Sequence, residues 1–249
     1  MEDYSGITAV ILAGGFGTRL QSVVSDKPKV LAEVSGRPFL SYLLEQLPPA
    51  GIRKAVICTG YLAEQIQDCF GAAYDSLRIV YSREDEPLGT GGALRLALPK
   101  LSSEIILVMN GDSYIDTDIS VYVNWFLEKK LQASLLLSWA EDTSRYGSVI
   151  INEDKTIASF DEKSENSGQG WINAGIYLIR KSLIASMPAG KYYSLEREFF
   201  PKLAGKGLYG FCVGGRFIDI GTPESYAAAQ EFFAAESFKG LAGTSTSSV

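Results

Sequence analysis

The chain has 249 residues, 46% of them hydrophobic and 21% charged, a composition that suits one large domain and excludes a chain disordered throughout. Its net charge is −6 and it has no run rich in lysine or arginine, which argues against nucleic acid as a partner. Because it contains no histidine, catalytic triads, Cys–His dyads and histidine-ligated zinc are excluded, and any chemistry must use carboxylates, lysine, arginine, backbone amides or a metal held by oxygen.

The first part of the chain alternates buried strands with amphipathic helices. Nearly continuous apolar runs, typical of strands covered on both faces, occur at residues 7–13, 55–59, 77–81, 105–109 and 133–139. Between them, helices are predicted at residues 38–47, 62–70, 92–98 and 119–131, the first with Pro38 at its first position. This alternation predicts an α/β fold, a three-layer, Rossmann-like mixed sheet that is mostly parallel with helices on both faces.

The pattern changes after Trp139. Short strands at residues 148–151 and 156–160 flank Asn152-Glu153-Asp154, which predicts an antiparallel hairpin subdomain in the second half. Further strands are predicted at residues 171–179 and 208–213, a short helix at 195–203, and a last helix at 223–233 with Thr222 as its cap. We expect residues 1–239 to form a single domain, and the Gly-, Ser- and Thr-rich residues 240–249 to be a flexible tail.

Three features predict a cytoplasmic protein without a membrane partner. The three cysteines are scattered and lack metal-binding spacing, so we interpret them as reduced thiols. The N-terminus is acidic where a signal peptide carries positive charge. No apolar run reaches the ~18–20 residues that a membrane span requires. The sequence leaves the oligomeric state open, and a homodimer is compatible with it.

The first predicted strand runs into a glycine-rich loop, Ala13-Gly14-Gly15-Phe16-Gly17-Thr18-Arg19-Leu20. Glycines after a parallel strand let backbone N–H groups approach a ligand closely, and ligands of such sheets bind at the carboxyl ends of the strands. One interpretation is therefore a polyphosphate site, with Arg19 as a bidentate donor. The other is a plain tight turn with a surface arginine. The spacing matches neither a Walker A loop nor a dinucleotide fingerprint.

A second segment, Asp26-Lys27-Pro28-Lys29-Val30-Leu31, follows this loop. Lys29 stands after a proline and before apolar residues, which predicts a partly buried side chain; two solvated lysines are the alternative. Together, residues 12–20 and 28–31 resemble the sugar-1-phosphate nucleotidyltransferase family, whose signature is LAGGxGTRL followed by PK-x-L. The resemblance extends to about residue 235. It implies a nucleotide-binding half at about residues 1–115 and a sugar-binding half at about residues 116–239.

The resemblance also implies roles for the first half. Arg19 would hold the outgoing phosphates, and Lys29 would contact the α-phosphate. The segment 86–93 looks like the base-binding loop, where Glu86 is suited to accept hydrogen bonds from guanine N1–H and N2–H₂; a plain loop–helix junction is the alternative. The nucleotide-binding residues implied are Leu12, Ala13, Gly14, Gly15, Gly17, Thr18, Arg19, Lys29, Glu86, Gly89, Thr90, Gly91, Asn110 and Gly111.

Two aspartates are candidates for a metal site. Asp112 follows the fourth buried strand, where a carboxylate is costly without a partner, and Asp219 stands between apolar residues before a turn. Mg²⁺ prefers carboxylates, phosphates and water, and the resemblance pairs these two residues as its ligands. The alternative for Asp112 is a turn or helix-capping role. Asp116 and Asp118 are expected to cap the following helix instead.

The second half carries the residues implied for the sugar 1-phosphate. The segment 160–163 resembles an FxEK motif, in which Glu162 would bind sugar hydroxyls and Lys163 the sugar phosphate. The segment 171–177 resembles one whose Asn173 and Gly175 edge the sugar pocket. A charged loop and an edge strand are the alternatives. The catalytic residues implied are Arg19, Lys29, Asp112 and Lys163.

The reaction implied is the in-line attack of a sugar-phosphate oxygen on the α-phosphorus of a nucleoside triphosphate, with release of pyrophosphate. The second pKa of a phosphate is near ~6, so the nucleophile is anionic at neutral pH and needs no general base. Residues 22–26, 37–40, 87–93 and 194–196 look most like guanylyltransferases that use GTP and D-glycero-D-manno-heptose 1-phosphate for bacterial surface polysaccharides. Val30, Glu33 and Arg37 depart from the usual pattern.

Several alternatives stay open. Mannose-1-phosphate guanylyltransferases share much of the pattern, and other uridylyl- or thymidylyltransferases share its general form. A protein of another class, a non-catalytic sensor of nucleotide-sugars, would need only the fold. A sensor need not keep Arg19, Lys29, Asp112, Lys163 and Asp219 together.

Overall fold

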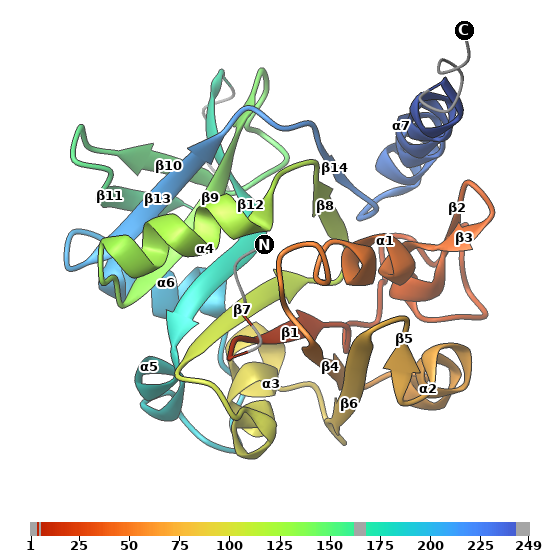
Figure 1. Cartoon of the computed structure of the whole chain (residues 1–249), viewed down its shortest axis with the longest axis horizontal. Helices are drawn as coiled ribbons and strands as arrows, with labels where there is room; N and C mark the ends of the chain where they lie inside the picture. Colours follow the sequence, from red (N-terminus) through yellow and green to blue (C-terminus); the bar gives the residue numbers. More distant parts are fainter. Residues whose placement is uncertain (1–3, 5, 162–167, 243–249) are drawn as a thin grey trace, which may run out of the picture.

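The computed structural model describes residue 4 and residues 6–161 and 168–242 (Figure 1). At its centre β1 (Thr8–Leu12) lies parallel between β4 (Lys54–Thr59) and β7 (Ile105–Asn110). On the outer side of β4 follow the parallel β6 (Leu77–Arg83) and the short antiparallel β5 (Ala73–Tyr74). These parallel strands end at one edge of the sheet, where the loops that follow them meet.

Helices cover both faces of this sheet because successive strand residues face opposite ways. In β1, Val10 packs into one hydrophobic cluster, whereas Ala9 and Ile11 pack into the other. The cluster of Ala9 includes residues of α1 (Phe39–Glu45), α2 (Ala63–Phe70) and α4 (Ile119–Glu128). The cluster of Val10 includes residues of α3 (Gly89–Ala97), α5 (Lys181–Ala185) and α6 (Phe200–Leu203). The predicted three-layer arrangement is therefore confirmed.

The second half of the chain continues the same sheet with antiparallel strands. The long strand β12 (Gly170–Arg180) pairs antiparallel with β7 on one side. On its other side it pairs with β9 (Ala133–Ala140), and near its start it also pairs with β10 (Ser148–Ile151), along the edge opposite β9. β10 forms the predicted hairpin with β11 (Ile157–Asp161), and β13 (Leu208–Val213) runs parallel to β9. The pairing of β7 with β12 joins the two halves of the chain in one sheet (Figure 1).

Several short elements differ from the sequence-based expectation. Two small ladders were not predicted, β2 (Glu33–Val34) with β3 (Arg37–Pro38) and β8 (Ser113–Ile115) with β14 (Phe217–Asp219). Strands of two or three residues are too short for an alternating pattern to be recognised. Pro38 precedes α1 in an extended conformation and is not its first residue.

The last two helical segments also differ. The predicted helix at 195–203 is a π-helical turn, η3 (Leu195–Phe199), followed by α6. α7 (Pro223–Ala242) runs past the predicted end at residue 233, because the alanine-rich sequence there favours a helix, and it includes residues 240–242 of the expected tail. The rest of that tail lies outside the described residues. No helix of the described chain is long and apolar enough to cross a membrane.

Candidate active site

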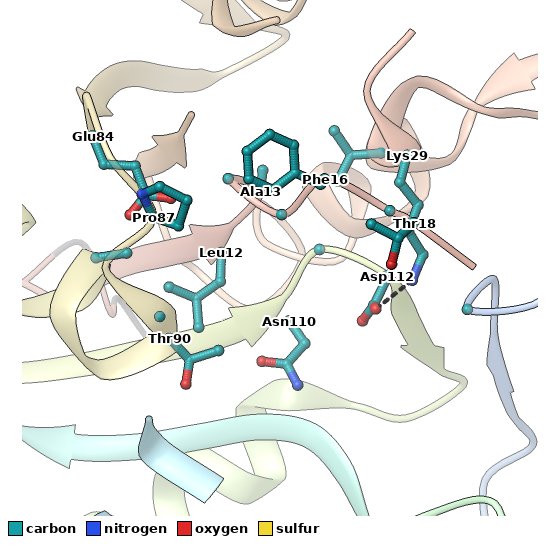
Figure 2. A pocket seen from close by; sticks show the side chains of 18 of the residues that line it. Leu12, Ala13, Phe16, Thr18, Lys29, Glu84, Pro87, Thr90, Asn110 and Asp112 are labelled. Atoms are coloured by element: carbon teal, nitrogen blue, oxygen red, sulfur yellow. Dashed lines mark hydrogen bonds and ion pairs between the residues drawn. The ribbon is translucent and has the colours of Figure 1, made fainter. Parts of the chain in front are cut away.

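A cavity of about 370 Å³ lies at the carboxyl ends of the parallel strands (Figure 2). This is the edge at which ligands of such sheets bind. Most of the predicted nucleotide-binding residues line it, although they come from four separate segments of the chain. These are Leu12, Ala13, Gly14, Gly15, Gly17, Thr18, Arg19, Lys29, Gly89, Thr90, Asn110 and Gly111.

Glycines bring the segments of this cavity close together. The Gly111 N–H donates to the Leu12 carbonyl over 2.9 Å, and a Cβ at Gly111 would lie 2.6 Å from that oxygen. Gly17 has a φ of +62°, which favours glycine, and a Cβ there would lie 3.1 Å from the Lys29 Cβ. The glycine-rich loop therefore packs directly on the stem of Lys29.

Lys29 and Asp112 form an ion pair beside the cavity, with Lys29 Nζ 2.6 Å from Asp112 Oδ2 (Figure 2). Lys29 opens the 3₁₀ turn η1 (Lys29–Leu31), whose other residues are buried, so the lysine side chain is only 13% exposed. The Asp112 side chain is 43% exposed. Burial alone would raise the pKa of Asp112, but the charge and hydrogen bond of Lys29 outweigh it, so the pKa is lowered and the carboxyl is ionised.

Asp219 lies beside this pair because β14 is antiparallel to β8 and places it opposite Ser113, the neighbour of Asp112. Asp219 Oδ1 accepts hydrogen bonds from the Gly221 N–H at 2.6 Å and from Ser225 Oγ at 2.9 Å. A Cβ at Gly221 would lie 2.7 Å from that oxygen and 3.7 Å from Lys29 Nζ. The structure thus brings together two carboxylates that are far apart in the sequence.

Tyr146 and Arg145 contact the same carboxylate, and the sequence did not point to them. The Tyr146 hydroxyl donates to Asp219 Oδ2 over 3.0 Å, and Arg145 Nη2 lies 3.7 Å from that oxygen. Burial, followed by the nearby charge of Asp219, raises the pKa of Tyr146 to about 12. Both residues follow the sheet strand β9 in a loop, where no periodic pattern indicates their direction.

The two aspartates are oxygen donors of the kind that Mg²⁺ takes. Mg²⁺ is usually held by one or two carboxylates, together with substrate phosphates and water. Among the described residues no cluster of three or more histidines, cysteines, aspartates and glutamates surrounds a point. Asp112 and Asp219 therefore fit an ion whose other ligands are phosphates and water, and they do not make an all-protein cage.

At the end of the cavity away from Asp112, the carboxylate in the lining is that of Glu84, whereas Glu86 was expected there (Figure 2). Glu84 lines the large cavity, its Oε2 accepts from the Leu88 N–H at 3.1 Å, and a Cβ at Gly14 would lie 2.6 Å from its Oε1. Burial raises the pKa of Glu84, opposed by the Leu88 hydrogen bond. Glu86 is exposed and lines a smaller neighbouring cavity of about 230 Å³. Glu84 directly follows β6, a carboxylate at a strand end like Asp112, and that signal points to it in the sequence.

The predicted sugar-binding residues are only partly described. Asn173 and Gly175 lie on β12, where Asn173 Oδ1 accepts from the Gly175 N–H at 2.9 Å. Neither lines the large cavity. Glu162 and Lys163 lie outside the described residues.

Gly91, a predicted nucleotide-binding residue, packs against the segment before η3, since its N–H donates to the Tyr193 carbonyl over 2.8 Å.

The remaining aspartates lie where they were expected or nearby. Asp118 caps α4, because its Oδ1 accepts from the Ser120 N–H at 2.9 Å, which confirms that expectation. Asp116 does not cap the helix and lies 3.7 Å from Arg216 Nη2. Both are therefore separate from the pair formed by Asp112 and Asp219.

Comparisons with known proteins show the family to which the chain belongs. The family model described as "Nucleotidyl transferase" matches residues 8–236. The chain is 38% identical over 224 residues to the D-glycero-alpha-D-manno-heptose 1-phosphate guanylyltransferase of Aneurinibacillus thermoaerophilus, covering 90% of this chain and 96% of that protein. It is 33% identical over 224 residues to the mannose-1-phosphate guanylyltransferase of Mycobacterium tuberculosis, covering 88% of this chain and 62% of that protein.

One of the matching solved structures is a complex with GMP-PN. It is HddC from Yersinia pseudotuberculosis complexed with GMP-PN, which matches with a TM-score of 0.80 at 37% identity and covers 91% of this chain and 99% of that one. The chain therefore belongs to the nucleotidyl transferase family, and within it the chain is similar to sugar-phosphate guanylyltransferases.

Proposed function

We propose that this protein transfers GMP from GTP to D-glycero-α-D-manno-heptose 1-phosphate, giving a GDP-sugar and pyrophosphate for surface polysaccharide synthesis. The observation that carries the proposal is the Lys29–Asp112 pair beside a cavity lined by the glycine-rich loop and Arg19. Relatives named for the heptose substrate align with nearly the whole chain at 38% and 37% identity, and the mannose relative of Mycobacterium tuberculosis is 33% identical.

The residues of this site suit a direct displacement. An oxygen of the sugar phosphate attacks the α-phosphorus of GTP, and the bond from that phosphorus to the β-phosphate oxygen breaks. The protein's task is to align two anions that repel each other and to stabilise the charge that develops. Arg19 binds the outgoing phosphates, Lys29 the α-phosphate and Lys163 the sugar phosphate. Asp112 holds Lys29 in place through their 2.6 Å contact.

Mg²⁺ is the cofactor that suits this donor set. Asp112 and Asp219 would hold it, and when bound it would neutralise charge on the phosphates. The hydrogen bonds that Asp219 accepts from Gly221, Ser225 and Tyr146 fix the direction of its carboxylate. Such partners of a metal ligand set its orientation and affinity.

A carboxylate is also suited to choose the base. Guanine has two adjacent donors, N1–H and N2–H₂, which adenine, uracil and thymine do not offer as a pair. Glu84 supports this role because it is partly buried, contacts Gly14 and lines the large cavity. Glu86 remains the alternative reader, from the smaller neighbouring cavity.

The test is pyrophosphate release, measured with GTP, ATP, UTP and dTTP against a panel of sugar 1-phosphates that includes heptose and mannose. We expect the highest kcat/KM with GTP and the heptose phosphate. A preference for mannose 1-phosphate would correct the sugar, and a preference for UTP or dTTP would correct the base. Tight binding of a nucleotide-sugar without any turnover would favour the sensor over the enzyme.

A further inference from the structure

A buried polar network lies behind the cavity and joins three elements of the fold. Its centre is the hydroxyl of Tyr177, a fully buried residue of β12. This oxygen lies 2.9 Å from Asn173 Nδ2 and 3.2 Å from Asn110 Nδ2. It also lies 3.4 Å from Glu196 Oε1, on η3. The network therefore connects β7, β12 and η3 through a single hydroxyl.

The number of protons in this network determines how each group is oriented. A phenol has one proton to donate and two lone pairs that accept, whereas a carboxylate only accepts. The Tyr177 proton therefore points to Glu196, and the two amide groups donate to the lone pairs. Burial, followed by the charge of Glu196, raises the pKa of Tyr177 well above its ordinary value, so the proton stays on the phenol.

Glu196 also holds a wall of the cavity. Its second oxygen accepts from Thr90 Oγ1 at 2.6 Å and from Ser194 Oγ at 3.1 Å. Thr90 Oγ1 in turn accepts from the Leu195 N–H at 2.8 Å. Thr90 stands in the first turn of α3 and lines the cavity. Glu196 thus links the first turn of α3 to the Tyr177 hydroxyl.

This arrangement leaves one acceptor without a partner. Asn173 Oδ1 accepts from the Gly175 N–H, but Asn110 Oδ1 is shielded from solvent and has no hydrogen-bond partner in the described part of the chain. Because Asn110 Nδ2 is bound to Tyr177, the oxygen has a set direction. Gly175 packs against this side chain, since a Cβ there would lie 3.1 Å from the Asn110 Cβ. Buried acceptors are rarely left unpaired, so Asn110, which lines the cavity, is expected to meet a donor from a ligand.

We propose that Asn110 Oδ1 accepts a hydrogen bond from a ribose hydroxyl of the bound nucleotide, and that Tyr177 and Glu196 are positioning residues that orient it. The inference rests on the proposed nucleotidyl transfer. Asn110 lies between Thr90, at the base-binding loop, and Asp112, at the phosphate site (Figure 2). In a nucleotide the ribose lies between the base and the phosphates, so its hydroxyls are the donors nearest to this position.

The test compares GTP with 2′-deoxy-GTP and 3′-deoxy-GTP on one enzyme preparation. We expect one deoxy analogue to lose about tenfold in kcat/KM in the wild-type protein. Asn110→Ala should bring that ratio close to one, and Tyr177→Phe should reduce it, because the Asn110 amide loses the acceptor that orients it. A ratio of two substrates does not depend on the fraction of enzyme that is folded, so a merely structural role would leave it unchanged. Ile150→Ala, an exposed position on β10, is the control and should keep the wild-type ratio.

Other results of this experiment would contradict the ribose inference. Equal use of all three nucleotides by the wild-type protein, or a ratio that survives Asn110→Ala, would overturn the inference. A sugar hydroxyl has the same chemistry as a ribose hydroxyl, so a 2-deoxy sugar 1-phosphate is tested in parallel. If Asn110→Ala abolished discrimination against that analogue alone, the ribose assignment would be wrong.

Failure of the proposed function can be distinguished from failure of the ribose inference. If UTP is the preferred nucleotide, the ratio is measured with UTP and its deoxy forms, and the ribose inference can hold while the guanine assignment fails. If no turnover occurs, dissociation constants for the same nucleotides, measured by calorimetry, replace kcat/KM. An unchanged ratio in Asn110→Ala with intact guanylyl transfer rejects the ribose inference alone.

Discussion

Lys29 and Asp112 are separated by 83 positions in the sequence, yet Lys29 Nζ lies 2.6 Å from Asp112 Oδ2. The lysine side chain is nearly buried, and the carboxylate is half exposed toward the cavity. Lys29 thus presents a cation and Asp112 an anion at the lining of the same cavity. The predictions below follow from this pair and from the groups around it.

Replacing either carboxylate of the proposed Mg²⁺ site should remove most of the activity. Asp112→Asn and Asp219→Asn are each expected to lower kcat by about 10²–10³-fold, because the charge that would hold the ion is lost while the side-chain volume is kept. Pyrophosphate release over a range of Mg²⁺ concentrations checks this. Asp116→Asn is the matched control, since that carboxylate is exposed and lies near Arg216. Near-normal turnover in Asp112→Asn would exclude the metal assignment.

Lys29→Ala should affect the chemical step more than substrate binding. If the ammonium acts mainly on charge that develops at the α-phosphate, kcat should fall by about 100-fold and the KM for GTP should change by less than about tenfold. Steady-state kinetics at saturating sugar phosphate measure both constants. Lys27→Ala makes the same change on a lysine whose side chain is 32% exposed and pairs with Glu33 at 3.1 Å, and it should leave both constants unchanged. An unaltered kcat in Lys29→Ala would assign the lysine to a structural role.

Glu84→Gln should weaken the preference for GTP over ATP, and Glu86→Gln should not. The amide can accept only one of the two guanine donors, and the expected loss of discrimination is about 10- to 100-fold. The kcat/KM ratio of GTP to ATP is measured for both variants. The two glutamates are two positions apart and undergo the same change, so each controls for the other. If only Glu86→Gln lost the preference for GTP, Glu86 would be the residue that recognises the base.

Glu84 should also make stability depend on pH. Its pKa is raised in the folded protein by burial, so the folded state binds a proton more tightly than the unfolded chain. The stabilisation that Glu84 gives the folded protein by binding this proton is fully present below the ordinary pKa of 4.5. It is lost as the pH rises through the higher pKa that Glu84 has in the folded protein. Glu84→Gln removes the cost of burying the charge. The Tm of this variant relative to wild type should therefore be higher at pH 7 than at pH 4, without nucleotide. A Tm difference that is equal at both pH values, or larger at pH 4, would contradict this.

Tyr146→Phe should raise the Mg²⁺ concentration needed for half-maximal activity by about tenfold. The hydroxyl donates to Asp219 Oδ2 over 3.0 Å, and its loss frees the carboxylate to turn away. The kcat at saturating Mg²⁺ should change much less. Tyr81→Phe, which removes an exposed hydroxyl bound to the Gly71 carbonyl, is the control. An unchanged Mg²⁺ dependence in Tyr146→Phe would separate this tyrosine from the metal site.

The sequence by itself determined the fold class and much of the cavity, because both depend on local patterns. Apolar runs such as residues 105–109 indicate burial on both faces, and the residues that follow such runs must lie at the ligand-binding edge. Asp112 and the glycine-rich loop were predicted there for this reason. The partial burial of Lys29 was predicted from the residues beside it, whereas its place in the site was implied by the resemblance to the family.

Only the tertiary structure decided which side chains meet. The pairing of Lys29 with Asp112, the contact of Tyr146 with Asp219 and the network around Tyr177 each join segments that are far apart in the chain. Hydrophobic periodicity reports whether a residue is buried, but it contains no information about its distant partner. The choice between Glu84 and Glu86 likewise depends on how the chain turns after β6, because Glu84 lines both cavities whereas Glu86 lines the smaller one. Contacts of this kind follow from strand order and loop packing, which the pattern of one segment cannot specify.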